Sequence, residues 1–404
     1  MQFKNKDFSD AREVLNVRNL RIGLTGRPQA NPVIDGIDLT IRAGETHCLV
    51  GESGSGKSVT SLAAMGLLPK SALEVQGGSI TLDDFEITSA SHYQMRQLRA
   101  RRIAMIFQEP MTALNPVLRV GEQIMEVLNM HSDLSQSEAK KRTLDMMDQV
   151  HLPDVNRIFS AFPHQLSGGQ RQRIMIAMAL ILDPDLLIAD EPTTALDVTT
   201  QLQILKLIAE MQERHGTAVL FITHDMGVVA EIADTVTVMQ QGKIVERAPI
   251  AELLTNPQKE YTRTLLTAVP NLTPRPARAG ASQDEVVRVA GLDMTYGGGG
   301  FFRRSEGVRA AQDVSFTIQP GRTLGIVGES GPGKSTVARA IMRLIDPTAG
   351  SVNVAGTEIA QLSRRQLRDH RKHLQIVFQD PYGSLNPRWT VARSLCAGPI
   401  NFGV

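Results

Sequence analysis

The sequence is poor in cysteine, in net charge and in long apolar runs. Its 404 residues include two cysteines, Cys48 and Cys396, which form no metal-binding spacing and no evident disulfide framework, as expected in a reducing cytosol. A net charge of +1 gives no reason to expect nucleic acid or an anionic membrane surface as the main partner. No run reaches the roughly 18 apolar residues of a membrane span, so we expect any membrane association to go through a partner.

What the chain does contain suits a globular protein of several domains. Apolar residues make up 42% of it, which is enough for packed cores, and the length predicts two or three domains. The first ten residues are polar and mixed in charge, unlike a secretory signal peptide.

A glycine-rich stretch at Gly51–Ser58 (GESGSGKS) fits the phosphate-binding pattern G-x-x-x-x-G-K-[ST]. The apolar residues 46–50 predict a buried strand before it, and residues 59–68 predict a helix that stops at Pro69. A strand, a glycine turn and a helix start surround an anion with backbone N–H groups. Lys57 adds a charge for the outer phosphates, and the Ser58 hydroxyl can bind Mg²⁺. Alone, the motif could also be a glycine-rich turn with a surface lysine.

Further strands and helices frame this loop. Alternating apolar residues over 14–44, with turns at Gly23, Gly26 and Gly36, and a short run at 80–82 predict strands that lead to the loop. Residues 117–160 predict helices, which we interpret as a helical insert at about 109–165 between two parts of an α/β core.

Polar residues stand at the ends of three predicted core strands, over 103–108, 186–191 and 218–222. The first ends in Gln108, whose side-chain carbonyl can bind Mg²⁺ or position water, although alone it could be an ordinary strand-end residue. The second ends in Asp190 and Glu191, which suit a Mg²⁺ contact and a general base. Two adjacent carboxylates at a strand end are costly unless they have partners or a chemical role. His224 follows the third strand and could contact a γ-phosphate, although alone it would more often be structural.

The segment 166–170 (LSGGQ) precedes a predicted helix over 171–182. Ser167 is a plausible N-cap, and Gly168 and Gly169 allow a phosphate to approach the helix start closely.

These motifs, in this order, resemble those of the ATP-binding subunits of ABC transporters. The resemblance implies an α/β P-loop NTPase core with an antiparallel β subdomain and a helical insert. It also gives each motif a name: Walker A at Gly51–Ser58, the Q-loop at Gln108, the signature at 166–170, Walker B with the catalytic glutamate at 186–191, the D-loop at Ala195–Asp197 and the switch histidine at His224.

Three other segments narrow the resemblance to the branch that imports peptides, nickel and similar solutes. They are FQEPMTALNP at 107–116, FITHDMGVVAEIAD at 221–234 and NPQKEYTRTLLTAVP at 256–270. The double-length ATPases of glutathione-type or microcin-type peptide importers are the most similar that we can suggest.

The pattern then begins again. A proline-rich stretch at 270–285 predicts a linker between a first nucleotide-binding domain at 12–269 and the N-terminal part of a second at 286–404. Gly328–Ser335 (GESGPGKS) repeats the first loop, and Phe378–Pro381 repeats Phe107–Pro110. Nothing after Gln379 supplies a second LSGGQ, carboxylate pair or switch histidine. We therefore expect an incomplete, tandemly repeated copy with an exposed core, and truncation rather than a shifted reading frame.

Two positions depart from the expected pattern. Pro332 stands where the first loop has Ser55. Because proline has no backbone N–H, the second loop would lose a hydrogen bond to phosphate worth about 1.5–3 kcal/mol. Tyr296 stands where the family places an aromatic side chain that stacks on adenine, and the first copy has Leu24 there.

By this resemblance the cofactors are ATP and Mg²⁺. The catalytic residues would be Glu191, His224, Gln108 and Lys57. The metal would be held by Ser58, Gln108 and Asp190, and in the second copy by Ser335 and Gln379. The nucleotide would be bound by Gly51, Ser53, Gly54, Ser55, Gly56, Lys57, Ser58, Val59, Ser167, Gly168, Gly169, Gln170, Tyr296, Gly328, Ser330, Gly331, Gly333, Lys334, Ser335, Thr336 and Gln379.

The resemblance implies an ATPase subunit that energises uptake of peptides or glutathione-like solutes at the cytoplasmic face of the inner membrane. Its partners would be two membrane permeases, an extracytoplasmic solute-binding protein and another nucleotide-binding domain in a head-to-tail dimer, without nucleic acid. Neither composite ATP site is complete within the chain. Two alternatives are a truncated fragment that binds ATP without hydrolysing it and a soluble ABC ATPase outside transport. The latter would need long basic arms or coiled-coil inserts, which the sequence does not contain.

Overall fold

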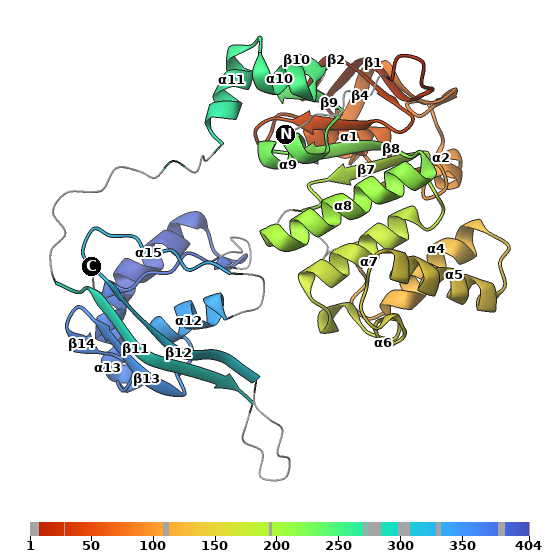
Figure 1. Ribbon diagram of the computed structural model, residues 1–404. Coiled ribbons are helices and arrows are strands. Elements are labelled where there is room, and N and C mark those ends of the chain that lie inside the picture. The colour runs from red at the N-terminus through yellow and green to blue at the C-terminus, as the bar shows by residue number, and fades with distance from the viewer. Residues whose placement is uncertain are drawn as a thin grey trace. The chain divides into compact units, whose positions relative to one another are not determined.

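The computed structural model (Figure 1) describes residues 8–27, 29–107, 113–193, 196–269, 273, 284–297, 308–328, 333–378 and 384–403. The chain divides into two compact units, residues 1–272 and 273–404. The predicted domain boundaries and the linker at 270–285 stay predictions.

The first unit contains two sheets. An antiparallel sheet has the strand order β2-β1-β4-β5, and a six-stranded sheet has the order β10-β9-β3-β8-β7-β6. The antiparallel sheet comprises β1 (Glu13–Leu24), β2 (Ile34–Arg42), β4 (Leu73–Leu82) and β5 (Phe85–Glu86). The six-stranded sheet comprises β3 (Thr46–Val50), β6 (Ile103–Ile106), β7 (Leu186–Asp190), β8 (Ala218–Thr223), β9 (Thr235–Gln240) and β10 (Lys243–Pro249).

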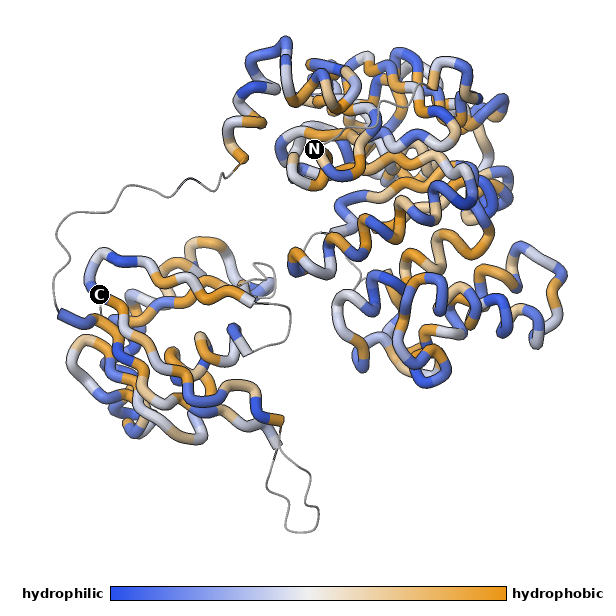
Figure 2. The backbone as a smooth tube through the Cα atoms, in the orientation of Figure 1, coloured by the Kyte–Doolittle hydropathy of each residue, from blue (hydrophilic) through white to orange (hydrophobic). Residues whose placement is uncertain are grey.

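Five strands of the larger sheet are parallel, and only β10 runs antiparallel to its neighbour. Every residue of β3, β7 and β8 is buried, because both faces of this sheet are covered. Successive side chains of a strand point to opposite faces of this sheet, and each face packs into a separate hydrophobic core. Cys48 and Val50 therefore pack against the helices on one face, whereas Leu49 packs toward the antiparallel sheet on the other. Figure 2 shows these central strands as a mainly hydrophobic band.

Helices surround this core. They are α1 (Lys57–Ala64), α2 (His92–Leu98), α4 (Val120–His131), α5 (Gln136–Gln149), α6 (Val155–Phe159), η1 (Pro163–Gln165), α7 (Gly168–Leu180), α8 (Val198–His215), α9 (Met226–Ile232), α10 (Ile250–Thr255) and α11 (Glu260–Thr267). Helices α4, α5 and α6 pack beside α7 in a helical lobe, as expected for the insert (Figure 1). Among the described helices, none is long and apolar enough to cross a membrane.

Three local predictions were wrong. Helix α1 ends at Ala64 instead of Leu68, because Gly66 adopts φ +63° and turns the chain before Pro69. Helix α7 begins at Gly168 instead of 171, since Ser167 and Gln170 form a capping box, and it ends at Leu180. Gly23 and Gly36 lie within β1 and β2 and not at turns between strands.

The second unit repeats the antiparallel sheet in the order β12-β11-β13-β14. Its elements are β11 (Val287–Tyr296), β12 (Val308–Ile318), α12 (Lys334–Ile341), β13 (Ala349–Val354), β14 (Thr357–Glu358), α13 (Arg364–His370), η2 (Arg371–His373) and α15 (Val391–Asn401). In both units the first strand pairs with the second and third in the same antiparallel arrangement. The prediction of a tandem repeat is thereby confirmed.

The second unit has a buried cluster around Val289, Leu292 and Val352, but another part of its core is exposed, as expected. Residues 322–328 and 374–378, the counterparts of β3 and β6, form no strands. In the first unit β3 pairs with β8 and β9, and β6 pairs with β7, whereas the described part of the second unit has no equivalents of these partners. Leu324, Ile326 and Val327 are therefore 43%, 46% and 92% exposed.

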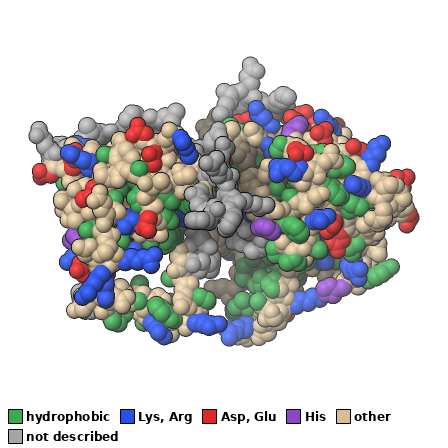
Figure 3. Space-filling model, turned by 90° about the horizontal axis from the view of Figure 1, so that it is seen from below, with side chains coloured by type: hydrophobic (Ala, Val, Ile, Leu, Met, Phe, Trp, Pro, Cys, Tyr) green, Lys and Arg blue, Asp and Glu red, His purple; other side chains and the backbone are tan. Residues whose placement is uncertain are grey.

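Charged side chains of both signs lie on the face of the molecule shown in Figure 3. On the face shown in Figure 3, acidic and basic side chains are interspersed instead of forming one large field of a single sign. This distribution agrees with the net charge of +1.

Candidate functional site

The phosphate loop lies between β3 and α1, as its sequence predicts. A Cβ atom at Gly51 would lie 2.1 Å from the carbonyl oxygen of Met239, so only glycine lets β9 approach the loop this closely. Gly56 caps α1 with φ +104°, in the region that favours glycine. The loop thus turns directly into a helix start, where backbone N–H groups are available to an anion.

Lys57 is held by the loop itself. Its Nζ donates to the carbonyl oxygens of Gly51 (2.7 Å) and Glu52 (2.8 Å) and to Ser55 Oγ (3.3 Å). The side chain is buried, and burial lowers the pKa of Lys57 while the charges of Glu191 and Asp190 oppose that shift. A buried ammonium bound mainly by neutral carbonyls is well placed to accept an anion such as phosphate.

Ser58 and Asp190 form a pair of oxygen ligands. Ser58 Oγ donates to Asp190 Oδ1 at 3.1 Å, although the two residues are far apart in the sequence. Burial raises the pKa of Asp190, the charge of Glu191 raises it further, and the bond from Ser58 and the charge of Lys57 oppose the shift. A hydroxyl and a carboxylate at this separation fit Mg²⁺, which prefers oxygen ligands and keeps several waters.

Glu191 and His224 come together from neighbouring strands. Because β7 and β8 are parallel, their carboxyl ends meet at one edge of the sheet, and Glu191 N–H donates to the Ile222 carbonyl at 2.9 Å. His224 Nδ1 lies 3.0 Å from Glu191 Oε1. Glu191 adopts φ +47°, an uncommon backbone conformation for a residue other than glycine. This arrangement can orient a carboxylate toward a water molecule.

One cavity of about 780 Å³ lies beside the start of the phosphate loop, Glu191 and His224. The cavity is lined by residues of the phosphate loop, by Glu191 and His224, and by residues of α11 and the turn after it. The lining residues are Val50, Gly51, Glu52, Ser53, Glu191, His224, Asp225, Met226, Leu265, Ala268 and Val269. The predicted proximity of the phosphate loop, Glu191 and His224 is therefore present. The contribution of α11 was not predicted, although the spacing of Tyr261, Leu265 and Leu266 is that of an apolar helix face.

The signature segment lies outside the lining of this cavity. Ser167 Oγ accepts the Gln170 N–H at 3.3 Å, and Gln170 Oε1 accepts the Ser167 N–H at 3.1 Å, which fixes the start of α7. A Cβ atom at Gly169 would lie 2.8 Å from Thr200 Cγ2, whereas one at Gly168 would meet no atom of the described residues within 4 Å. Packing against the described residues of its own unit therefore does not require glycine at position 168.

The second copy keeps part of the loop geometry. Lys334 Nζ donates to the Gly328 carbonyl at 2.7 Å, as Lys57 does to Gly51, and Gly333 caps α12 with φ +92°. Ser335 and Thr336 lie in the first turn of α12. Tyr296 and Leu24 each end the first strand of their antiparallel sheet, which supports the predicted correspondence.

Several predicted residues fall outside the described part of the chain. They are Gln108, Ala195, Ser330, Gly331, Pro332 and Gln379. The roles predicted for these residues stay predictions.

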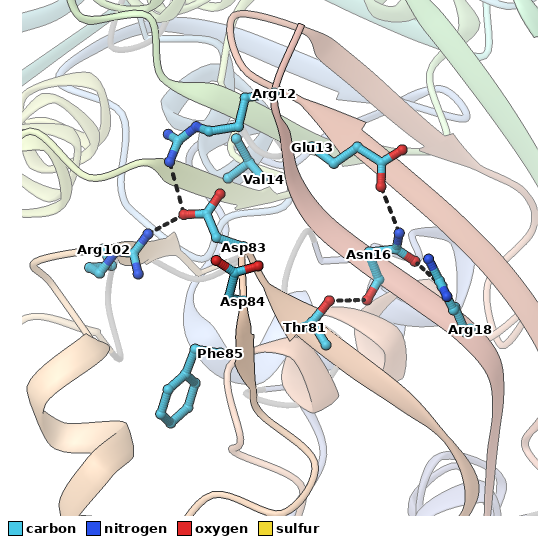
Figure 4. A pocket seen from close by; sticks show the side chains of 10 residues that line it. All are labelled: Arg12, Glu13, Val14, Asn16, Arg18, Thr81, Asp83, Asp84, Phe85 and Arg102. Carbon is cyan, nitrogen blue, oxygen red and sulfur yellow. Dashed lines mark hydrogen bonds and ion pairs between the residues drawn. The ribbon is translucent and has the colours of Figure 1, made fainter.

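A different cavity lies where β1, β4 and β5 meet the core (Figure 4). Its guanidinium groups face carboxylates: Arg12 donates to Asp83 at 2.9 Å and to Asp185 at 3.1 Å, and Arg102 donates to both of these residues. Because Arg12 and Arg102 are both paired with Asp83 and Asp185, this network ties the antiparallel sheet to the residue before β7.

Comparison with known proteins identifies this arrangement. A sequence model of a family described as ABC transporter matches residues 34–194 and 311–398. The chain belongs to the ABC transporter family. The resemblance inferred from the motifs and the predicted fold class are confirmed, and the protein is an ABC-type ATPase whose ligand is ATP.

Curated members of the family resemble almost the whole chain. The glutathione import ATP-binding protein GsiA of Salmonella typhimurium is 46% identical over 422 aligned residues, which cover 97% of this chain and 68% of that protein. GsiA of Escherichia coli O157:H7 is 45% identical over the same shares.

Solved ABC structures match a single cassette. The dimeric ATP-binding cassette MJ0796 in a post-hydrolysis state with ADP and Pi has a TM-score of 0.52 and 25% identity, covering 58% of this chain and 98% of that one. The protein cbiO1 of Clostridium perfringens, part of an ABC transporter complex, has a TM-score of 0.52 and 27% identity, covering 64% and 96%.

Proposed function

We propose that this ABC ATPase powers the import of glutathione or similar small peptides through separate membrane permeases. The observation that supports this most is the 46% identity to a glutathione import ATP-binding protein over 97% of the chain. Permeases and a solute-binding protein on separate chains would choose the solute. The ATPase would then bind the cytoplasmic face of the membrane through the permeases.

The first unit supplies the groups that such an ATPase needs. The loop N–H groups and Lys57 would bind the phosphates, and Ser58 and Asp190 would hold Mg²⁺, which neutralises phosphate charge when bound. Glu191 would accept a proton from the attacking water as its oxygen bonds to the γ-phosphorus and the bond to ADP breaks. His224, at 3.0 Å from Glu191, would hold that carboxylate in position.

The signature would act on a second nucleotide-binding domain. Gly168 and the start of α7 are not among the residues that line the cavity beside the phosphate loop and Glu191, which supports a head-to-tail pair in which each signature covers the nucleotide of the other domain. ATP bound between two domains would hold them together, and hydrolysis of the ATP would let them separate.

The helical lobe offers a surface for a permease. A mainly apolar cavity between the core and the lobe, of about 180 Å³, is lined by side chains that include Phe107, Leu114, Val127, Met175 and Met178. Its lining includes Phe107 and Ala113, the described residues that precede and follow the segment with Gln108 in the sequence. Movement of a bound permease segment would therefore be transmitted to the nucleotide edge of the sheet.

Uptake by cells provides the test. The chain, produced with the permeases and the solute-binding protein of a glutathione importer in cells that lack the ATPase of that importer, should support ATP-dependent glutathione uptake. The variant Glu191→Gln should lower ATP turnover at least about 100-fold while ATP still binds. Glu210→Gln, at an exposed position on α8, is the matched control and should behave as the parent.

The outcomes separate the alternatives. Wild-type protein that binds ATP without turnover would overturn the proposal in favour of a catalytically silent binding protein. Normal turnover without uptake of glutathione or short peptides would leave an ATPase and refute the assigned solute.

A further inference from the structure

Helix α11 contacts the phosphate loop through Tyr261. The Glu52 N–H donates to the Tyr261 hydroxyl at 3.2 Å. The same peptide unit carries the Gly51 carbonyl, which accepts a hydrogen bond from Lys57 Nζ at 2.7 Å. Lys57, this peptide and Tyr261 therefore form one chain of hydrogen bonds, in which each bond polarises the next.

The position of Tyr261 is fixed by an anchor on β10. Glu246 is 8% exposed, and its carboxylate accepts hydrogen bonds from Gln258 N–H at 2.7 Å and Lys259 N–H at 3.1 Å. The hydroxyl of Thr262, next to Tyr261, donates to the same carboxylate. Since β10 belongs to the sheet whose strand β3 runs into the loop, the first turn of α11 and the phosphate loop share one rigid support.

The same segment also forms a wall of the nucleotide cavity. Leu265, Ala268 and Val269 line it together with Glu52 and Glu191. Leu265 also packs, with Tyr261, against the buried core cluster. The tyrosine ring therefore contributes packing, and its hydroxyl contributes a contact that packing does not require.

We propose that Tyr261 is a positioning residue for the phosphate loop. Its hydroxyl fixes the orientation of the Gly51–Glu52 peptide and thereby the place from which Lys57 meets the outer phosphates. Tyr261 touches no reacting atom, so it sets the affinity for nucleotide and leaves the chemical step unchanged. The inference depends on the nucleotide site of the first unit and is independent of the transported solute.

The test replaces Tyr261 by phenylalanine, which keeps the ring and removes the hydroxyl. Both parent and variant carry Lys334→Ala in the full chain, so that binding reports on the first unit. Loss of one hydrogen bond should raise the Kd for ATP about 3- to 10-fold, measured with a fluorescent ATP analogue and by competition with ATP. The KM for ATP should rise equally, with kcat unchanged.

A matched control and the thermal stability separate positioning from a general defect. Tyr93→Phe, in the same background, removes a hydroxyl from a side chain that is 71% exposed on α2 and should change neither Kd nor kcat. Thermal unfolding defines the temperature range in which all variants are folded, and binding is measured within it. An unchanged Kd for Tyr261→Phe, or a lower kcat at an unchanged Kd, would overturn the proposal.

Discussion

We predict that alanine substitutions at the two glycines of the signature segment affect stability and ATP turnover differently. Gly168 and Gly169 are neighbours in the first turn of α7, and alanine at either position raises helix propensity by about 1 kcal/mol. The surroundings differ. At residue 168 the new methyl group would meet no atom of the described residues within 4 Å, but at residue 169 it would lie 2.8 Å from Thr200 Cγ2.

Thr200 has little freedom to move aside. Its hydroxyl donates to Asp197 Oδ2 at 2.8 Å, and its N–H donates to Asp197 Oδ1 at 3.0 Å, which caps α8. Crowding of this kind costs about 1–3 kcal/mol. We therefore expect Gly169→Ala to be neutral or to destabilise by up to about 2 kcal/mol, and Gly168→Ala to be neutral or to stabilise by up to about 1 kcal/mol.

The ATP turnover of Gly168→Ala should fall, although the substitution does not destabilise the fold. If a phosphate on a second nucleotide-binding domain approaches the N–H groups at the start of α7, a methyl group at residue 168 displaces it. A displacement of about 1 Å costs roughly 100-fold in rate. Gly168→Ala should then lose ATP turnover while its melting temperature is unchanged or rises by about 2–4 °C.

Differential scanning calorimetry and a phosphate-release assay on the full chain measure the two quantities. Wild-type turnover in Gly168→Ala would refute the placement of a phosphate at this helix start. A fall in melting temperature as large as that of Gly169→Ala would refute the structural reasoning about open space at residue 168.

Two further predictions concern pH and the base of the nucleotide. Burial alone would raise the pKa of Glu246, but the hydrogen bonds from Thr262, Gln258 and Lys259 lower it. The ionised Glu246 carboxylate therefore stabilises the fold fully above about pH 4.3, the pKa of glutamate in the unfolded chain. This stabilisation is lost as the pH falls through the lower pKa of Glu246 in the folded protein. The stability difference between wild type and Glu246→Gln in pH-dependent thermal unfolding should accordingly be constant near neutral pH and shrink below pH of about 4, and a difference that grows on acidification would contradict this. Leu24→Tyr, in a Lys334→Ala background, should lower the Kd for ATP about 2- to 10-fold by stacking on adenine, and an unchanged Kd would exclude adenine from the end of β1.

The local motifs were predictable because each is a short stretch with its own conformational preference. The sequence alone indicated the strand, glycine turn and helix around Lys57, the capping serine of the signature and the carboxylate pair at Asp190 and Glu191. It also indicated the repeat and its exposed core, since both follow from counting the motifs present in each copy.

Contacts between distant segments were decided only by the tertiary structure. The bond from Glu52 to Tyr261 joins residues more than two hundred positions apart, and no local preference specifies it. The same holds for the different surroundings of Gly168 and Gly169, which depend on where Thr200 comes to lie. A sequence motif fixes the backbone of a few residues, whereas the neighbours of that backbone are set by the packing of the whole sheet and its helices.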